Sequence, residues 1–192
     1  SGFRHDLLAC PESREYFEKI CKSYISGQIK VAPEHISEKV LKLMNKPVPK
    51  VYEEFLIAFD KAKQKSVHKL YPVNYFIASH PGASLKEALE LGLYLAKHRI
   101  HPEQVQDFIP LPMTASGCMY YTGQNPMTGE EVYVPKTMRE RKIQRAFIQY
   151  FVPENKALLL EGLKELNSLN LLSVFLKAGI STGKKYSVCD EE

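Results

Sequence analysis

The chain has 192 residues, of which 44% are hydrophobic and 25% charged, the composition of a globular protein that buries a core. This length suits one domain or slightly more. No apolar run approaches the about 20 residues that a membrane-spanning helix needs, and no basic-then-apolar leader opens the sequence. The four cysteines form no C-x-x-C pair and no zinc-like spacing, so we expect no disulfide framework and a reducing, cytoplasmic compartment.

Positive charge is concentrated in one segment. The formal net charge is +4, and residues 136–145 carry five basic side chains against the single Glu140, which accounts for all of it. The rest of the sequence is balanced, so any electrostatic preference for a partner is expected to be local.

The first 109 residues alternate between strand-like and helix-like patterns. The expected elements, in chain order, are the end of a strand at residues 1–9, a helix from Pro11 with Cys21 on its buried face, a strand at 28–32, a helix capped by Ser37 and stopped by Pro47, a longer helix carrying Val51 to Phe59, a strand at 73–78, a helix opened by the capping box Ser84–Glu87, and a strand at 105–109. Strands separated by crossover helices indicate a parallel sheet with helices packed on it.

After residue 109 the pattern changes. Residues 120–123 and 131–134 flank a loop that contains Gly and Pro, which predicts a hairpin. The capping box Thr137–Glu140 opens a helix, and two Leu-rich helices follow at 154–166 and 169–177. The predicted divisions are an α/β part at residues 1–117, a hairpin with a helical extension at 118–180, and a disordered polar tail at 181–192.

Unusual residues gather in the loops that follow the second, third and fourth expected strands, at residues 32–35, 79–82 and 110–113. In a parallel α/β layout, ligands bind beyond the carboxyl ends of the strands. The Glu34 carboxylate could accept hydrogen bonds from hydroxyl groups, and Gly82 would allow close approach of a ligand. Taken singly, each loop is an ordinary proline-containing turn, but three of them on one rim favour a binding site.

Several familiar motifs do not occur. The sequence contains no HExxH, no G-x-S-x-G and no Walker or dinucleotide Gly-rich pattern. No metal site and no catalytic residue is therefore assigned, and no motif supports a function as a hydrolase or as an enzyme that binds nucleotide phosphates.

Long strings of the sequence resemble the YgiQ family of radical S-adenosylmethionine (SAM) proteins, an uncharacterised group. The matching strings are residues 27–35 with 40–44, residues 75–82, residues 105–114 with 119–123, and residues 134–136 with 144–146. The opening residues 1–6 are also similar to the family's fourth barrel strand, and the resemblance extends over about residues 1–165.

The resemblance implies the C-terminal portion of a partial TIM-type barrel, with parallel strands and crossover helices, followed by the family's extension. It also implies a [4Fe-4S] cluster, held by three cysteines in C-x3-C-x2-C, and SAM, from which the enzyme makes a radical. No such cysteine triple occurs in this sequence. We therefore expect the chain to be inactive alone, with the missing N-terminal half of the same polypeptide as its main partner and with substrate and reaction unassigned.

The residue roles carried over from the resemblance are expectations. The predicted cofactor-binding residues are Arg4, Lys30, Glu34, Ser79, His80 and Gly82, and the predicted substrate-binding residues are His35, Pro112 and Met113. For Glu34, a plain inter-helix ion pair is an open alternative.

Two other functions compete for the C-terminal extension. The basic helix at 136–145 could bind an RNA backbone or a protein partner, which would make the chain a non-catalytic binding module. Alternatively, the extension covers the exposed edge of a partial barrel and shapes the substrate pocket.

Overall fold

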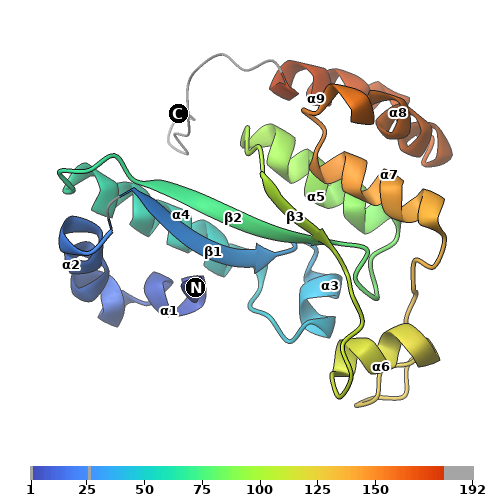
Figure 1. The fold of residues 1–192 in the computed structure, drawn as a ribbon, viewed down its shortest axis with the longest axis horizontal. Helices are drawn as coiled ribbons and strands as arrows, with labels where there is room; N and C mark the ends of the chain where they lie inside the picture. The colour runs from blue at the N-terminus through green and yellow to red at the C-terminus, as the bar shows by residue number, and fades with distance from the viewer. Residues whose placement is uncertain (1, 26, 180–192) are drawn as a thin grey trace.

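The computed structural model describes residues 2–25 and 27–179. One parallel sheet is formed, in the order β1 (Gln28–Glu34), β2 (Tyr71–Ala78) and β3 (Gln104–Asp107) (Figure 1). Helices join consecutive strands, as the alternating pattern predicted, so the chain is a mixed α/β protein with the architecture of part of an α/β barrel. Cys189 and the predicted tail at 181–192 lie outside the described residues.

The segment before β1 is extended only at its beginning. The Phe3 N–H donates to the Lys30 carbonyl at 2.7 Å, and Phe3 forms a parallel bridge with Val31. Helix α1 (His5–Ala9) follows, so the prediction of a strand through residue 9 was wrong beyond this bridge. Asp6 lies in the first turn of α1, where a negative side chain favours the helix.

The connections between strands contain the predicted helices, although the Ser37 side chain makes no cap bond at α3. Burial of the Cys21 side chain on α2 is confirmed, and the Ser84–Glu87 capping box is formed in full. The helices before and between the strands are α2 (Arg14–Ser23), which follows the short turn η1 (Pro11–Ser13), then α3 (Glu38–Leu43), α4 (Pro49–Gln64) and α5 (Leu85–Lys97).

The two faces of the sheet differ in burial. Alternate residues of the strands, among them Ile29, Val31 and Phe76, are buried in the core. The intervening residues are half-buried or exposed, and Lys30 and Gln106 are exposed. In Figure 1, α4 lies behind β1 and β2, and their other face is turned toward the viewer. Because parallel sheets are normally covered on both faces, this open face is unusual for a complete α/β domain.

Helix α6 (Ala115–Thr122) replaces the first strand of the predicted hairpin. The Thr114 side chain accepts the Gly117 N–H at 3.0 Å and caps the helix, and Gly123 ends it with a φ of 70°. These two caps prevail over the strand propensity of the tyrosines between them.

What remains of the hairpin is a turn. An antiparallel bridge joins Gln124 to Glu131, and the Gly129 N–H donates to the Asn125 carbonyl at 2.8 Å. The hairpin prediction therefore holds for the reversal of the chain and was wrong for its first strand.

The predicted C-terminal helices are confirmed. They are α7 (Met138–Ile148), α8 (Lys156–Glu165) and α9 (Leu172–Gly179), with the short turns η2 (Pro153–Asn155) and η3 (Leu169–Leu171) before α8 and α9. The Thr137 side chain accepts the Glu140 N–H at 3.2 Å and caps α7. Helix α7 packs directly on α5, and a Cβ atom placed on Gly92 would lie 2.6 Å from the Phe147 carbonyl oxygen.

Across residues 2–25 and 27–179, every helix is too short or too polar to cross a lipid bilayer.

We predict that Gly92→Ala destabilises the chain by about 1–3 kcal/mol, the usual cost of overpacking. The atom in the way belongs to the backbone of α7, so the clash cannot be relieved by rotating a side chain. This cost should exceed the gain of about 1 kcal/mol in helix propensity. Urea unfolding measures the change, with Gly27→Ala as the control because nothing lies within 4 Å of its added Cβ. Equal stability of the two variants would contradict the prediction.

Candidate binding site at the carboxyl ends of the strands

Each of the three loops beyond the strands contains a non-glycine residue with positive φ. The φ angles are 64° at Glu34, 62° at Ser79 and 61° at Met113. Such conformations cost about 1–3 kcal/mol each and cluster at functional sites. The strands point these loops toward α3 and α6 (Figure 1), and no pattern in the sequence predicted the strained conformations.

Glu34 is the centre of a tight three-residue turn. The His35 N–H donates to the Pro33 carbonyl at 2.8 Å, and together with the positive φ of Glu34 this describes a γ-turn of the rare, strained kind. The Glu34 carboxylate lies 2.9 Å from the Lys46 ammonium group. The ion pair that was the alternative to ligand binding is therefore formed, with a lysine that the sequence analysis did not identify.

His35 is held inside the protein by the main chain. Its Nδ1 accepts the N–H groups of Ile36 and Ser37, both at 2.9 Å, and only 2% of the residue is exposed. Burial, assisted by the nearby His80, lowers the pKa of His35 to about 3. The predicted cap bond from the Ser37 side chain is not formed, and the His35 ring instead bonds the main chain just before α3. This geometry supports a structural role for His35 more than the predicted substrate contact.

Ser79 and Gly82 place two unusual groups in the loop after β2. The Ser79 hydroxyl is buried, and its oxygen has no hydrogen-bond partner in the structure. Gly82 has a φ of 93°, and a Cβ atom there would lie 2.3 Å from Leu43 of α3. An unpaired buried hydroxyl beside a position that only glycine can occupy is a suitable contact for a polar ligand.

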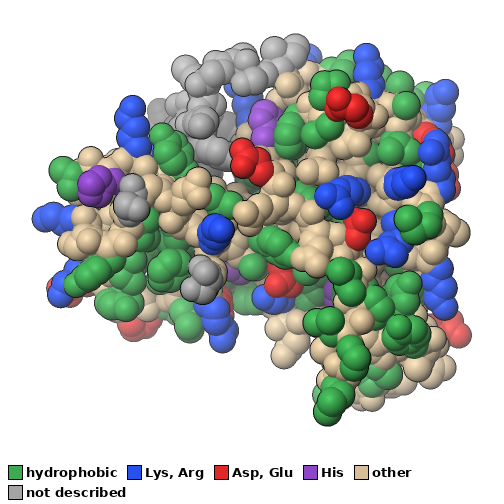
Figure 2. Space-filling view, in the orientation of Figure 1, with side chains coloured by type: hydrophobic (Ala, Val, Ile, Leu, Met, Phe, Trp, Pro, Cys, Tyr) green, Lys and Arg blue, Asp and Glu red, His purple; other side chains and the backbone are tan. Residues whose placement is uncertain are grey.

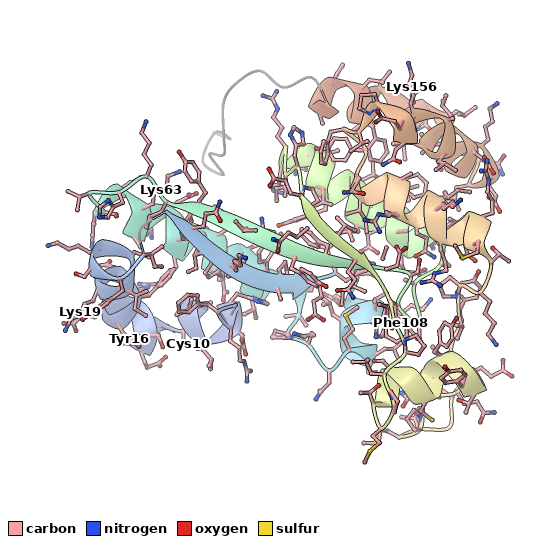
Figure 3. All side chains as sticks on the ribbon, viewed as in Figure 1. Cys10, Tyr16, Lys19, Lys63, Phe108 and Lys156 are labelled. Atoms are coloured by element: carbon pink, nitrogen blue, oxygen red, sulfur yellow. The ribbon has the colours of Figure 1, made fainter. Side chains whose placement is uncertain are left out.

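His80 links this loop to α6. Its Nδ1 lies 2.7 Å from the Pro81 carbonyl, so Nδ1 carries the proton, and its Nε2 accepts the Ser116 hydroxyl at 2.8 Å. The ring meets Phe108 edge-on, and Figure 3 shows Phe108 between the end of β3 and α6. Burial lowers the pKa of His80 to about 4, so the ring is neutral near pH 7.

Two cavities adjoin the rim. The larger, of about 970 Å³, lies between α3, α6 and the turn before Tyr133, and Gly82 contributes to its wall. The smaller, of about 510 Å³, is lined by Pro112 and Met113, together with residues of α6 that carry no charge. Figure 2 shows hydrophobic side chains gathered over α6. Both volumes fall in the range of small-molecule sites.

Of the predicted cofactor-binding residues, Gly82 lines the larger of these two cavities, and Ser79 and His80 are buried in the same loop without reaching either one. Arg4 pairs with Asp6 at 2.5 Å, and 73% of its side chain is exposed. Lys30 is exposed on the open face of the sheet. The structure thus brings Ser79, His80 and Gly82 together, with His35 close by, and leaves Arg4 and Lys30 outside that group.

The basic helix uses most of its arginines within the chain. Arg139 pairs with Glu161 of α8. Arg141 and Arg145 donate to the carbonyls of Phe108 and Val105, at 3.0 and 3.1 Å. These contacts place α7 along β3 and support the role of the extension as a cover for the sheet edge. Lys136, Arg139 and Lys142 are the exposed cations of this cluster, and Arg139 is already paired with Glu161, which weakens the RNA-binding alternative.

Within the described part of the chain, no group of three or more His, Cys, Asp and Glu side chains is arranged to hold a metal ion.

The fold and the rim together define the class of this protein as an incomplete parallel α/β unit with a candidate ligand site at the carboxyl ends of its strands. Residues 103–175 match the family described as Domain of unknown function (DUF3362). This match begins at β3 and covers the extension through the first half of α9.

Longer proteins share most of the chain. A UPF0313 protein of Clostridium botulinum (strain 657 / Type Ba4) is 45% identical over 172 residues, which are 90% of this chain and 27% of that protein. A UPF0313 protein of Methanosarcina acetivorans is 46% identical over 171 residues, 89% of this chain and 23% of that protein. One from Methanocella arvoryzae is 44% identical over 172 residues, 90% of this chain and 28% of that protein. The chain thus spans about a quarter of the length of these relatives.

We predict that acid destabilises the fold through its buried histidines. The pKa values of His35 and His80 lie below the ordinary 6.5, so the unfolded chain binds protons that the folded chain does not. Stability should fall as the pH drops below 6.5, by up to about 1.4 kcal/mol per pH unit for each histidine. Burial also lowers the pKa of His5, which adds a loss in the same direction.

Urea unfolding between pH 7 and pH 5 measures this slope above the range in which carboxylates titrate. His80→Gln should reduce the slope, whereas a change at the exposed His68 should leave it as in wild type. A wild-type stability that stays constant over this range would refute the assignment.

Proposed function

We propose that this chain forms the C-terminal part of the barrel of a radical SAM enzyme and supplies rim loops that bind SAM and the substrate. The observation that carries the proposal is that three strained loops lie at the carboxyl ends of parallel strands, each within a string that resembles the YgiQ family. The substrate and the reaction are not part of the proposal.

The open face of the sheet supports a barrel that other residues complete. Lys30 and Gln106 are exposed on that face, where a parallel sheet in a finished domain would be covered. The parallel bridge between Phe3 and Val31 shows that the outer edge of β1 already accepts a parallel neighbour. The UPF0313 relatives are about four times as long as the matched region, so a longer polypeptide of this kind would have residues to cover the open face.

The residues of the rim fit SAM better than they fit an iron–sulfur cluster. The Ser79 hydroxyl has no hydrogen-bond partner in the structure and could bond a nucleoside or amino-acid group, and Gly82 of the same loop lines the larger cavity. The sequence has no C-x3-C-x2-C, and burial with the nearby Glu18 raises the pKa of the Cys21 thiol to about 11, which opposes a thiolate ligand. The cluster would therefore have to be held by residues outside this chain.

In this proposal the chain positions ligands and performs no proton transfer of its own. Ser79 would bond a polar group of SAM, and the neutral His80 would keep the loop in place through Ser116. The uncharged pocket at Pro112 and Met113 would receive an apolar part of the substrate and exclude water. Glu34 would act indirectly, because its carboxylate is engaged by Lys46.

Anaerobic reconstitution with iron and sulfide tests the division of roles. This chain alone should bind no stoichiometric cluster and should not cleave SAM, whereas a longer polypeptide that contains it should do both. A stoichiometric, SAM-cleaving cluster on the chain alone would overturn the proposal, and so would a longer polypeptide that binds neither group.

We predict that Ser79→Ala in the longer polypeptide weakens SAM binding by about 2- to 10-fold, the loss of one hydrogen bond. Ser37→Ala is the matched control, since Ser37 is also buried near the rim but makes no side-chain cap bond. Equilibrium binding of SAM measures the difference. Equal affinities of the two variants would remove Ser79 from the site.

The RNA-binding alternative has a simple test. Binding of a generic tRNA by this chain in the micromolar range, weakened by added salt, would favour it. The internal contacts of Arg139, Arg141 and Arg145 argue against that outcome.

A further inference from the structure

The loop after β2 is tied at both ends to a single side chain of α7. Gln144 accepts the Ser79 N–H at 3.1 Å through its Oε1 and donates to the Ala83 carbonyl at 2.8 Å through its Nε2. The residue is only 1% exposed. One amide group therefore spans the whole loop of residues 79–83.

A closed ring of hydrogen bonds surrounds this clamp. The Gln144 amide also donates to Glu140 at 3.2 Å, and Glu140 accepts the Tyr133 hydroxyl at 2.8 Å. The Tyr133 carbonyl in turn accepts the Gly82 N–H at 2.7 Å. The hydrogen bonds therefore run from Ser79 through Gln144, Glu140 and Tyr133 and end at Gly82 in the same loop.

Gln144 is a polar side chain at a buried position of α7 where an apolar one would pack. The neighbours of Gln144 on α7, including Ile143, Ala146 and Phe147, are buried apolar residues of the core. A buried amide is unfavourable unless its donors and acceptors are satisfied, and here each of its two polar atoms has a partner. The position is thus suited to hold the loop in a conformation that its own residues resist, since Ser79 has a positive φ.

From these contacts we infer that Gln144 is a positioning residue, and that the segment of unknown function at 103–175 fixes the rim loop 79–83. All the partners outside the loop, namely Ser116, Tyr133, Glu140 and Gln144, belong to that segment. The identity of the ligand rests on the proposed function, but the positioning of the loop does not. The extension thereby determines where Ser79, His80 and Gly82 stand relative to any ligand.

Amide hydrogen exchange in the ligand-free chain tests the inference. Gly82 and Ala83 are the reporters, because their N–H groups donate to Tyr133 and His80 and not to Gln144. In Gln144→Leu we expect their exchange to be at least tenfold faster than in wild type. The control is Ile143→Val, which loosens the adjacent position of α7 against α8 without touching the loop.

Loop amides that exchange as in wild type would overturn the inference. So would an equal acceleration throughout β2 and α5, because Gln144 would then contribute only to general packing.

A second variant separates positioning from packing and remains informative if Gln144→Leu does not fold. Protonated Glu has one acceptor oxygen and one O–H donor, so it can keep the bonds to the Ser79 N–H and the Ala83 carbonyl and loses only the second amide donation, to Glu140. Ionised Glu is an acceptor only and faces the Glu140 carboxylate. In Gln144→Glu the exchange of Gly82 and Ala83, corrected for the intrinsic pH dependence, should be near that of wild type at pH 5. It should accelerate at least tenfold by pH 9.

The pH window avoids three titrating groups near the loop. The pKa of His80 is lowered to about 4 by burial, and that of Tyr133 is raised to about 12 by burial and by Glu140. Glu87, whose charge also acts on Tyr133, has its pKa lowered to about 2, because its bonds to Ser84 and Lys39 outweigh the effect of burial. A pH-independent Gln144→Glu loop would contradict the positioning role.

Binding of SAM to the longer polypeptide distinguishes this inference from the proposed function. If loop exchange changes in the Gln144 variants as described and their affinity for SAM falls in parallel, both the inference and the proposed function are supported. If the loop responds but no SAM binds to the wild-type polypeptide, the positioning role is supported and the proposed function is overturned.

Discussion

A parallel sheet of only three strands leaves two edges and two faces to be satisfied, and the structure depends on how one of these edges is closed. Arg141 and Arg145 reach from α7 to main-chain carbonyls at β3, so the edge meets guanidinium donors where another strand would otherwise pair. This contact fixes α7 beside the sheet. The positions of α5, α8 and the loop after β2 follow from it, because each of them packs on or bonds to α7.

The rim shows what this arrangement achieves. Loops that end parallel strands are held in strained backbone conformations, and groups from outside the sheet offset the cost: Lys46 at Glu34, Ser116 at His80 and Gln144 at Ser79. The buried histidines contribute as neutral hydrogen-bonding groups and not as charges. The result is a loop whose polar groups are held in place from outside and whose Gly82 lines a cavity, as the proposed role in binding and orientation requires.

The sequence was sufficient for the elements whose signals are local. The strands, the capping box at Ser84 and the helices after Thr137 follow from alternation, helical spacing and caps. Helix α6 was missed because its tyrosines favour a strand, although Thr114 and Gly123 are recognisable caps at its two ends. The rule for parallel sheets predicts a site at this rim, and Ser79, His80 and Gly82 lie within one loop of the rim, so their assignment to a site stays a prediction.

The partners of the site residues were beyond prediction from one sequence. Lys46, Ser116 and Gln144 are 12, 36 and 65 residues from the groups they hold, and no local pattern links such positions. The same is true of the arginines at β3, which look in the sequence like a solvated basic face. Burial and pairing of polar groups are properties of the fold, so sequence spacing alone overstated the charge available to a partner.

The close contact between Gly92 and the backbone of α7 also affects the position of Gln144. Phe147, which Gly92 touches, lies one helical turn after Gln144. The separation of the two helices is set there by main-chain atoms, so Gly92 works as a spacer whose thickness no rotamer can adjust. Any side chain at this position would move α7 and carry Gln144 with it, so that a residue with no contact to the rim controls the registration of the loop beside the cavity.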